Sequence, residues 1–396
     1  MSGGTVTLFV CGDVMLGRGV DQILARPGDP ALREGYVTDA RAYVRMAESV
    51  NGPIPAPVDP SWPWGEALRL LEANAPDVRI VNLETSVTRS DAFEPGKAVH
   101  YRMHPANLPA LTVARPDVCV LANNHVRDFG LSGLRETLDV LHGAGLRTAG
   151  AGRTAEEAYT PVALPLPHGG RVLVFALGAA DSGVPAGWAA TAERPGVAHV
   201  PELTPATAAA AVRRIRRVKR PGDLVVVSVH WGSNWGYIVP REQRRFGHAL
   251  VDGGADVVHG HSSHHPRAAE VYRDRLILHG CGDFIDDYEG IPGFEEYRDD
   301  LRIAYFVTLA ADTGALTGLR MEPLLARRMR LEPAPAKDRG WLQTTLDRIG
   351  YDVHVTLDRD GALVLSGRSA VSRRAAPPAH RRPSADGSRR TTHRPS

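Results

Sequence analysis

Histidines gather in two places along this chain of 396 residues, and each place directly follows an apolar, β-branched run. His230 follows Leu224–Val229, and four more histidines lie within seven residues after Val257-Val258, namely His259, His261, His264 and His265. A lone histidine near a core is usually a packing residue. Four in one loop that also holds glycine and serine are hard to explain by packing, and neutral imidazole is a common ligand of divalent metals. The pattern therefore predicts a metal site.

Oxygen donors follow other apolar runs in the same way. Asp13 follows Val6–Cys11 through Gly12, Glu84 comes shortly after Val78, and Asn124-His125 follow Val118–Leu121. A parallel sheet presents its working groups beyond the carboxyl ends of its strands, so these side chains are expected to converge with the histidines. Each acidic or amide residue taken alone is equally well explained as a turn or cap residue.

The elements that must position these groups alternate along the chain. Strands are predicted at Val6–Cys11, Val78–Val81, Val118–Leu121, Arg171–Leu177, Leu224–Val229, Asp256–Val258 and Leu276–Leu278. Helices are predicted at Leu131–Gly143, Ala206–Arg220 and Arg241–Asp252. Strands that alternate with helices favour a layered α/β domain.

The C-terminal part is predicted to be organised differently. A hinge at Glu332–Lys337 separates a main domain (1–330) from a small appendage (331–367), which is expected to hold a helix at Gly340–Ile349 and a strand pair. Residues 368–396 are rich in Arg, Pro and Ser and are predicted to be a disordered tail.

Composition excludes several classes of protein. The net charge is +2, but residues 371–396 hold seven Arg and one acid, which leaves 40 basic and 44 acidic residues in the rest. A mildly acidic body lacks the basic surface that nucleic-acid binding requires. Three cysteines are too few for a disulfide framework and predict buried free thiols. With no signal peptide and no apolar stretch long enough to span a membrane, we expect a cytoplasmic protein.

Several motifs occur together in one order and spacing: Gly12–Leu16, Asn82–Glu84, Tyr101–Pro105, Asn123–His125 with Asp128–Gly130, His230–Gly232, Gly260–His264 and Gly282–Phe284. This set resembles the CapA family of capsule and poly-γ-glutamate synthesis proteins, which is itself similar to the calcineurin-like metallophosphoesterases. The resemblance covers about Thr5 to Leu325. It implies a layered α-β-β-α sandwich with a site for two divalent ions, with Mn, Fe and Zn all compatible with mixed N and O ligands.

The resemblance also implies roles for single residues. Asp13 and His264 would hold the first metal, and Glu84 would bridge the two metals. The second metal would be held by Asn124, His230 and His261. His125 would protonate the leaving group, with Asp128 orienting it. The sequence departs from the metallophosphoesterase pattern at Met15, Glu84 and Val126, and its Ser262-Ser263 leaves open whether His264 or His265 is the ligand.

Substrate-binding residues are predicted around this centre. Arg18 is close enough in sequence to Asp13 to clamp an anionic group, although a surface ion pair is an equal alternative. Tyr101, Arg102 and His104 are expected to reach a carboxylate-bearing substrate, and Trp231 is expected to line the cleft. The expected partner is therefore a small-molecule or peptide-like anion; nothing in the sequence indicates the oligomeric state.

Three functions remain open at this point. The first is a metal-dependent hydrolase acting on a phosphoester or on a glutamyl or peptide-like amide, since one metal clamp serves both reactions. The second is a non-catalytic, metal-binding component of poly-γ-glutamate or capsule synthesis, against which the missing signal peptide and anchor weigh. The third, a nucleic-acid-binding module that uses the Arg-rich tail, conflicts with the acidic body.

Overall fold

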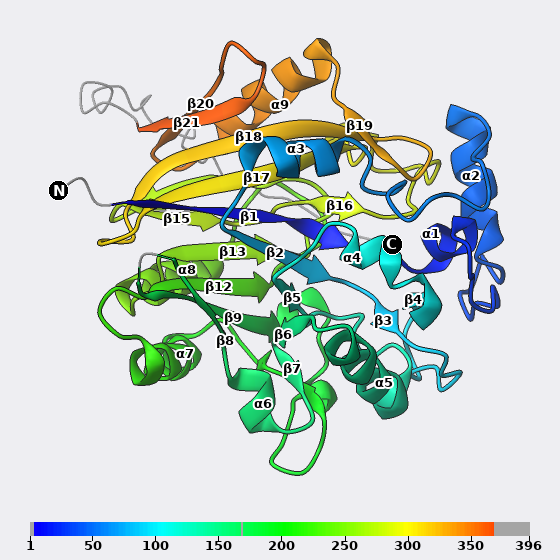
Figure 1. Ribbon diagram of the computed structural model, residues 1–396, viewed down its shortest axis with the longest axis horizontal. Helices are drawn as coiled ribbons and strands as arrows, with labels where there is room; N and C mark the ends of the chain where they lie inside the picture. Colours follow the sequence, from blue (N-terminus) through cyan, green and yellow to red (C-terminus); the bar gives the residue numbers. More distant parts are fainter. Residues whose placement is uncertain (1–3, 168, 368–396) are drawn as a thin grey trace, which may run out of the picture.

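Two β-sheets packed face to face, with helices on both outer faces, form the body of the molecule (Figure 1). The computed structural model describes residues 4–167 and 169–367. The layered α-β-β-α sandwich predicted from the sequence is confirmed by this arrangement. The Arg-rich tail predicted at 368–396 lies outside the described residues.

The larger sheet has the strand order β20-β21-β18-β17-β1-β2-β5-β6, with β16 pairing with β1 and β19 with β18. Its strands are β1 (Thr5–Val14), β2 (Val78–Leu83), β5 (Val118–Val120), β6 (Arg147–Ala149), β16 (Asp283–Ile285), β17 (Leu301–Ala310), β18 (Leu316–Ala326), β19 (Leu331–Pro333), β20 (Val353–Leu357) and β21 (Leu363–Gly367). Strands β1, β2, β5 and β6 run parallel to one another, while β17 and β18 are antiparallel additions.

The smaller sheet has the order β11-β9-β12-β13-β15-β14, with β8 pairing with β9. Its strands are β8 (Val162–Pro165), β9 (Arg171–Ala179), β11 (His199–Val200), β12 (Leu224–His230), β13 (Val257–His261), β14 (Ala269–Tyr272) and β15 (Arg275–Leu278). Two short pairs, β3 (Ser86–Val87) with β4 (Arg102–Met103) and β7 (Ala151–Gly152) with β10 (Gly196–Val197), lie outside both sheets.

Helices cover the two outer faces. The larger sheet is covered by α1 (Arg18–Ile23), α2 (Arg41–Asn51), α3 (Glu66–Asn74), α4 (Pro109–Thr112) and α5 (Gly130–Gly143). The smaller sheet is covered by α6 (Ala155–Tyr159), α7 (Pro205–Val218) and α8 (Arg241–Asp252). Helix α9 (Ala336–Ile349) packs against β20. Among the described residues no helix is long and apolar enough to cross a membrane.

Strand β1 shows why the sequence folds into layers. Leu8 and Val10 belong to the core between the sheets, whereas Phe9 and Cys11 belong to the core under the helices. Successive side chains of a strand point to opposite faces, so a strand buried on both faces is apolar throughout. This explains why the parallel strands were recognisable in the sequence as continuous apolar runs.

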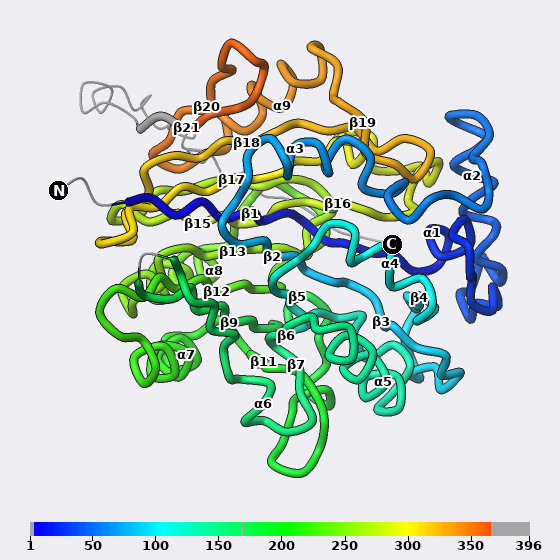
Figure 2. Tube along the Cα trace, viewed as in Figure 1, coloured from blue at the N-terminus to red at the C-terminus, as the bar shows by residue number. Residues whose placement is uncertain are grey.

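The predicted elements and the structure differ at particular places. The strand pair β17–β18 was not predicted, although these are among the longest strands described. Helix α8 has the predicted bounds, while β1, β12 and β13 run on to include Asp13, His230 and His261. The predicted C-terminal strand pair exists as β20–β21, and β21 pairs with β18, so it extends the larger sheet at its edge (Figure 2).

Candidate metal centre

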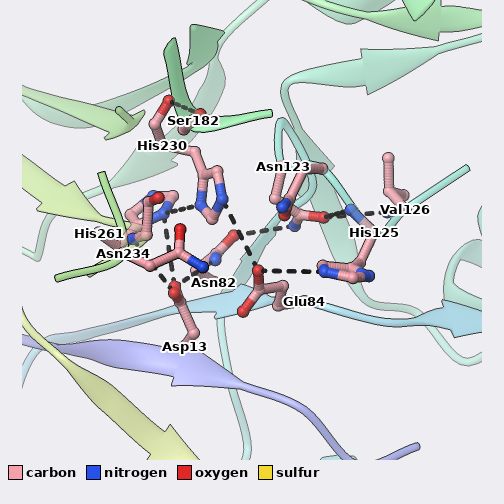
Figure 3. A network of polar contacts seen from close by, with 12 residues as sticks. Asp13, Asn82, Glu84, Asn123, His125, Val126, Ser182, His230, Asn234 and His261 are labelled. Carbon is pink, nitrogen blue, oxygen red and sulfur yellow. Dashed lines mark hydrogen bonds and ion pairs between the residues drawn. The ribbon is translucent and has the colours of Figure 1, made fainter. Parts of the chain in front are cut away.

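The register of the sheets places the candidate ligands side by side. In the larger sheet Asp13 of β1 is level with Asn82 of β2 on one side and with Asp283 of β16 on the other. In the smaller sheet His230 of β12 is level with His261 of β13. Figure 3 shows that Asp13 and Glu84 from one sheet face His230 and His261 from the other. The carboxyl ends of strands from both sheets therefore build one site.

A glycine permits the close approach of two of these strands. A Cβ atom on Gly12 would lie 1.8 Å from the carbonyl oxygen of Gly282, so no larger residue fits there. The backbone N–H of Asp13 donates to this same carbonyl at 3.0 Å. The pair of glycines thus brings the carboxylates of Asp13 and Asp283 into one small volume.

The first candidate ligand group combines one carboxylate with two imidazoles. Asp13, His230 and His261 each offer an atom, and these atoms lie within 4.8 Å of one another. Nδ1 of His261 lies 3.5 Å from Oδ1 of Asp13 and 2.8 Å from Nδ1 of His230. The other nitrogen of His261 lies 2.8 Å from the hydroxyl of Ser228, which fixes the ring.

The second group consists of carboxylates alone. Ligand atoms of Asp13, Glu84 and Asp283 also lie within 4.8 Å of one another, so Asp13 belongs to both groups. All three side chains are buried. Three buried carboxylates this close repel one another strongly unless protons or cations neutralise them.

Several polar atoms at this site lack hydrogen-bond partners. Within the described part of the chain, Oε2 of Glu84, Nε2 of His230 and Oδ1 of Asn124 are buried and have no hydrogen-bond partner. A buried polar atom without a partner costs free energy, so such atoms indicate a missing ligand or a functional role. All three are typical metal-binding atoms, and the donor set therefore fits a divalent cation.

Burial sets the protonation states. Burial, reinforced by the charge of Asp283, raises the pKa of Asp13 to about 7. Burial and the charges of Asp13 and Asp283 raise the pKa of Glu84 well above its ordinary value. Burial lowers the pKa of His230 and His261 far enough to keep both imidazoles neutral, the form that binds metals.

His125 forms a separate unit beside the centre. Its Nδ1 lies 2.6 Å from Oδ2 of Asp128, and its Nε2 lies 4.0 Å from Oε1 of Glu84. Tyr101 stacks on the ring at a centroid distance of 3.8 Å. Burial lowers the pKa of His125 to about 4 in spite of the opposing charge of Asp128. The structure thus brings the predicted acid–base pair together and turns its free nitrogen toward the centre.

Lys97 supports this unit, although no pattern in the sequence marks it. Its ammonium donates to the side chain of Asp128 and to the backbone carbonyl of Asn124, and lies 3.4 Å from Nδ1 of His125. Burial alone would raise the pKa of Asp128, but the interactions with His125 and Lys97 outweigh burial and lower it. Asp128 therefore stays ionised, with the N–H of Tyr101 as its third partner.

His264 contacts a member of one candidate ligand group but belongs to neither group. Its Nδ1 lies 3.0 Å and 3.1 Å from the two carboxylate oxygens of Asp283, and its Nε2 lies 3.0 Å from Nδ2 of Asn234. Burial opposes its charge, but Asp283 raises the pKa of His264 above the ordinary value. In this position His264 contacts a candidate ligand and belongs to neither candidate ligand group, and its predicted role as a metal ligand stays a prediction.

Arg18 occupies a buried network and not an open clamp. Its guanidinium donates to Asp287 at 2.5 to 3.2 Å and to Glu34 at 3.0 Å, and it lies 3.6 Å over the ring of Tyr43. It also lies 4.9 Å from the ring centroid of Tyr101. The donors of Arg18 are therefore used within this buried network, which supports the ring of Tyr101.

Three predicted substrate-binding residues have side chains that contact groups outside the candidate centre. Arg102 pairs with Asp91 at 2.6 Å, and His104 accepts from the N–H of Ala106 at the start of a short helix. Trp231 is 1% exposed in the core under α8, and its Nε1 donates to the carbonyl of His279. Their positions assign them to packing and local hydrogen bonding and do not support direct contact with a substrate at the centre.

Two residues of the centre were missed. Asn82 donates to Oδ1 of Asp13 at 2.6 Å and accepts from Asn123 at 3.0 Å, while Asp283 supplies the third carboxylate. Both lie in recognised motifs, Asn82–Glu84 and Gly282–Phe284, and both are level with Asp13 across the sheet. The signal was their position at strand ends, but β16 is too short to be recognised as a strand from its own residues.

The fold and this site define a class of protein: a layered α/β sandwich with paired ligand groups at the strand ends. The chain belongs to the bacterial capsule synthesis protein PGA_cap family, whose model matches residues 7–288. The "Probable polyglutamine synthesis accessory protein" of Mycobacterium tuberculosis is 51% identical over 361 residues, which cover 90% of this chain and 95% of that protein.

More distant relatives share part of the chain. The capsule biosynthesis protein CapA of Bacillus anthracis is 28% identical over 76% of this chain and 63% of its own length. The PGA biosynthesis protein CapA of Bacillus subtilis is 30% identical over 57% of this chain and 56% of its own length. A solved phosphatase structure from Mycoplasma pneumoniae matches 82% of this chain and 94% of that one, with a TM-score of 0.45 and 10% identity.

Proposed function

We propose that this protein is a metal-dependent hydrolase with a dinuclear centre that cleaves an anionic phosphoester or a glutamyl or peptide-like amide. The observation that carries the proposal is the buried carboxylate of Asp13, which belongs to both candidate ligand groups at once. The unpartnered atoms of Glu84 and His230 support the same conclusion.

The residues that would hold metal are Asp13, Glu84, His230 and His261, with Asn124 available through its unpartnered oxygen. When bound, divalent ions would polarise the scissile group and make a bound water acidic enough to attack at neutral pH.

The chain itself supplies proton transfer. Asp128 holds Nδ1 of His125, which leaves the lone pair of Nε2 on the side of the centre. Nε2 would take up a proton from water and deliver it to the departing oxygen or nitrogen. Tyr101 fixes the plane of the imidazole by stacking on it. Removal of His125 is therefore expected to slow substrates with poor leaving groups more than activated ones, with metal content unchanged.

The test begins with elemental analysis of the purified full chain. Loaded protein is then assayed with phosphomonoesters, phosphodiesters and γ-glutamyl amides in the presence of Mn²⁺. Metal bound in the wild type and reduced in His230→Ala, with an unchanged circular dichroism spectrum, supports the centre; wild-type metal content in that variant removes His230 from it.

Turnover decides between the enzyme and a non-catalytic role in polymer synthesis. Hydrolysis that His125→Ala reduces mainly for poor leaving groups supports the hydrolase. Stoichiometric metal without turnover of any of the three substrate classes contradicts it and favours the role of a metal-binding component.

A further inference from the structure

The two ligand groups of the centre differ in chemistry. One group offers a carboxylate and two neutral imidazoles (Asp13, His230 and His261), while the other offers three carboxylates (Asp13, Glu84 and Asp283). Imidazole ligands suit zinc, iron and similar ions, whereas carboxylate oxygens suit hard ions such as magnesium and manganese. A pair of sites with such different donors is not expected to prefer the same ion at both positions.

Asp283 is the residue that makes the second group all oxygen. It is level with Asp13 in the parallel pair β1–β16, and the close contact between Gly12 and Gly282 allows no side chain to separate the two strands. Asp283 is 2% exposed, so its carboxylate has little access to water. Oε2 of Glu84, in the same group, is buried without a hydrogen-bond partner among the described residues, which points to a bound ligand.

The surroundings of Asp283 are those of a supported ligand. His264 contacts both of its carboxylate oxygens, and Asn234 contacts the far nitrogen of His264. Such hydrogen bonds from outside a metal site fix the orientation of the ligand and tune its basicity. This chain of contacts explains why His264 is held near the centre without joining either ligand group.

We propose that Asp283 is a metal ligand and that the centre is asymmetric: Asp13, Glu84 and Asp283 bind a hard ion of the magnesium or manganese type, and Asp13, His230 and His261 bind a softer ion of the zinc or iron type. The inference rests on the metal centre proposed above and deepens it. Asp13, which both groups share, links the two positions.

The experiment measures metal stoichiometry and not activity. Metal-free full-length protein is incubated with Mn²⁺ and Zn²⁺ together, desalted, and analysed for both elements. The wild type is expected to retain about one equivalent of each. Asp283→Asn is expected to lose the manganese and keep the zinc, His261→Ala is expected to lose the zinc and keep the manganese, and Asp13→Asn is expected to lose both.

Asp21 offers a matched control, because its carboxylate is equally buried and belongs to neither ligand group. It accepts hydrogen bonds from the side chain of Asn107 and from the backbone N–H groups of Gly28 and His104. Asp21→Asn is expected to retain both ions. The circular dichroism spectrum and thermal transition of each variant show that it is folded, and the Mn²⁺ electron paramagnetic resonance spectrum reports the environment of that ion directly.

The outcomes separate the two proposals. Two zinc ions in the wild type under the mixed condition, or wild-type manganese in Asp283→Asn, would overturn the asymmetric centre and leave the metal-dependent hydrolase intact. A wild type that binds neither ion would overturn both.

Discussion

The contact between Lys97 and Asp128 offers a quantitative test of how the acid–base unit is held. The side chain of Asp128 is fully buried and that of Lys97 is 16% exposed, so neither charge is well solvated. Lys97→Met leaves the carboxylate with His125 and the N–H of Tyr101 as its remaining partners. Asp128→Asn leaves the ammonium without its counter-charge.

Breaking a buried ion pair by removing one partner typically costs 3–5 kcal/mol. Because Asp128 keeps two other hydrogen bonds, the lower end applies, and each single variant is expected to lose about 3 kcal/mol of stability. The double variant has no buried unpaired charge, so its loss should be smaller than the sum of the two, with a coupling energy of about 2 kcal/mol.

Urea unfolding of the four metal-free proteins measures this coupling directly. Elemental analysis of the loaded proteins is the companion measurement, and metal content is expected to stay at the wild-type level because neither residue belongs to a ligand group. Losses that add to within about 0.5 kcal/mol would refute the reasoning, since independent sites behave in that way.

Two further predictions concern stability. Burial alone would raise the pKa of Glu270, but hydrogen bonds from His279, Arg244 and His248 outweigh burial and lower it to about 2. A carboxyl whose pKa falls on folding contributes stability that is fully present above its unfolded pKa, here near 4.5. That stability is lost as the pH falls toward 2. Glu270→Gln should therefore cost about 3 kcal/mol of unfolding free energy at pH 7, measured by urea unfolding. A cost below 1 kcal/mol would show that the network contributes little. Trp231→Ala, at a side chain 1% exposed in the core, should cost about 3–5 kcal/mol while the Michaelis constant of the folded protein stays unchanged; a large rise in that constant with little loss of stability would return Trp231 to the substrate site.

The sequence alone predicted alternating strands and helices and the strand ends at which candidate ligands lie, and the reason is local. Apolar runs buried on both faces identify parallel strands, and the working groups of a parallel sheet lie beyond the carboxyl ends of its strands. Asp13, Glu84, His125, His230 and His261 were found in this way.

The tertiary structure decided what depends on pairing between distant segments. Asp283 follows β1 by some 270 residues and becomes a candidate ligand only because β16 pairs with β1 in register. Lys97 reaches Asp128 from an irregular segment that carries no periodic signal.

The same dependence accounts for the residues predicted at the site that lie elsewhere. Trp231 adjoins His230 in sequence, yet it points into the core under α8, while Arg102, one residue after Tyr101, is bound by Asp91. Neighbours along an extended chain face opposite directions, so closeness in sequence to a functional residue does not bring a side chain to the site. Sequence patterns predicted which strand ends present candidate ligands. The register and the side-chain direction that bring individual residues together were decided only by the packed structure.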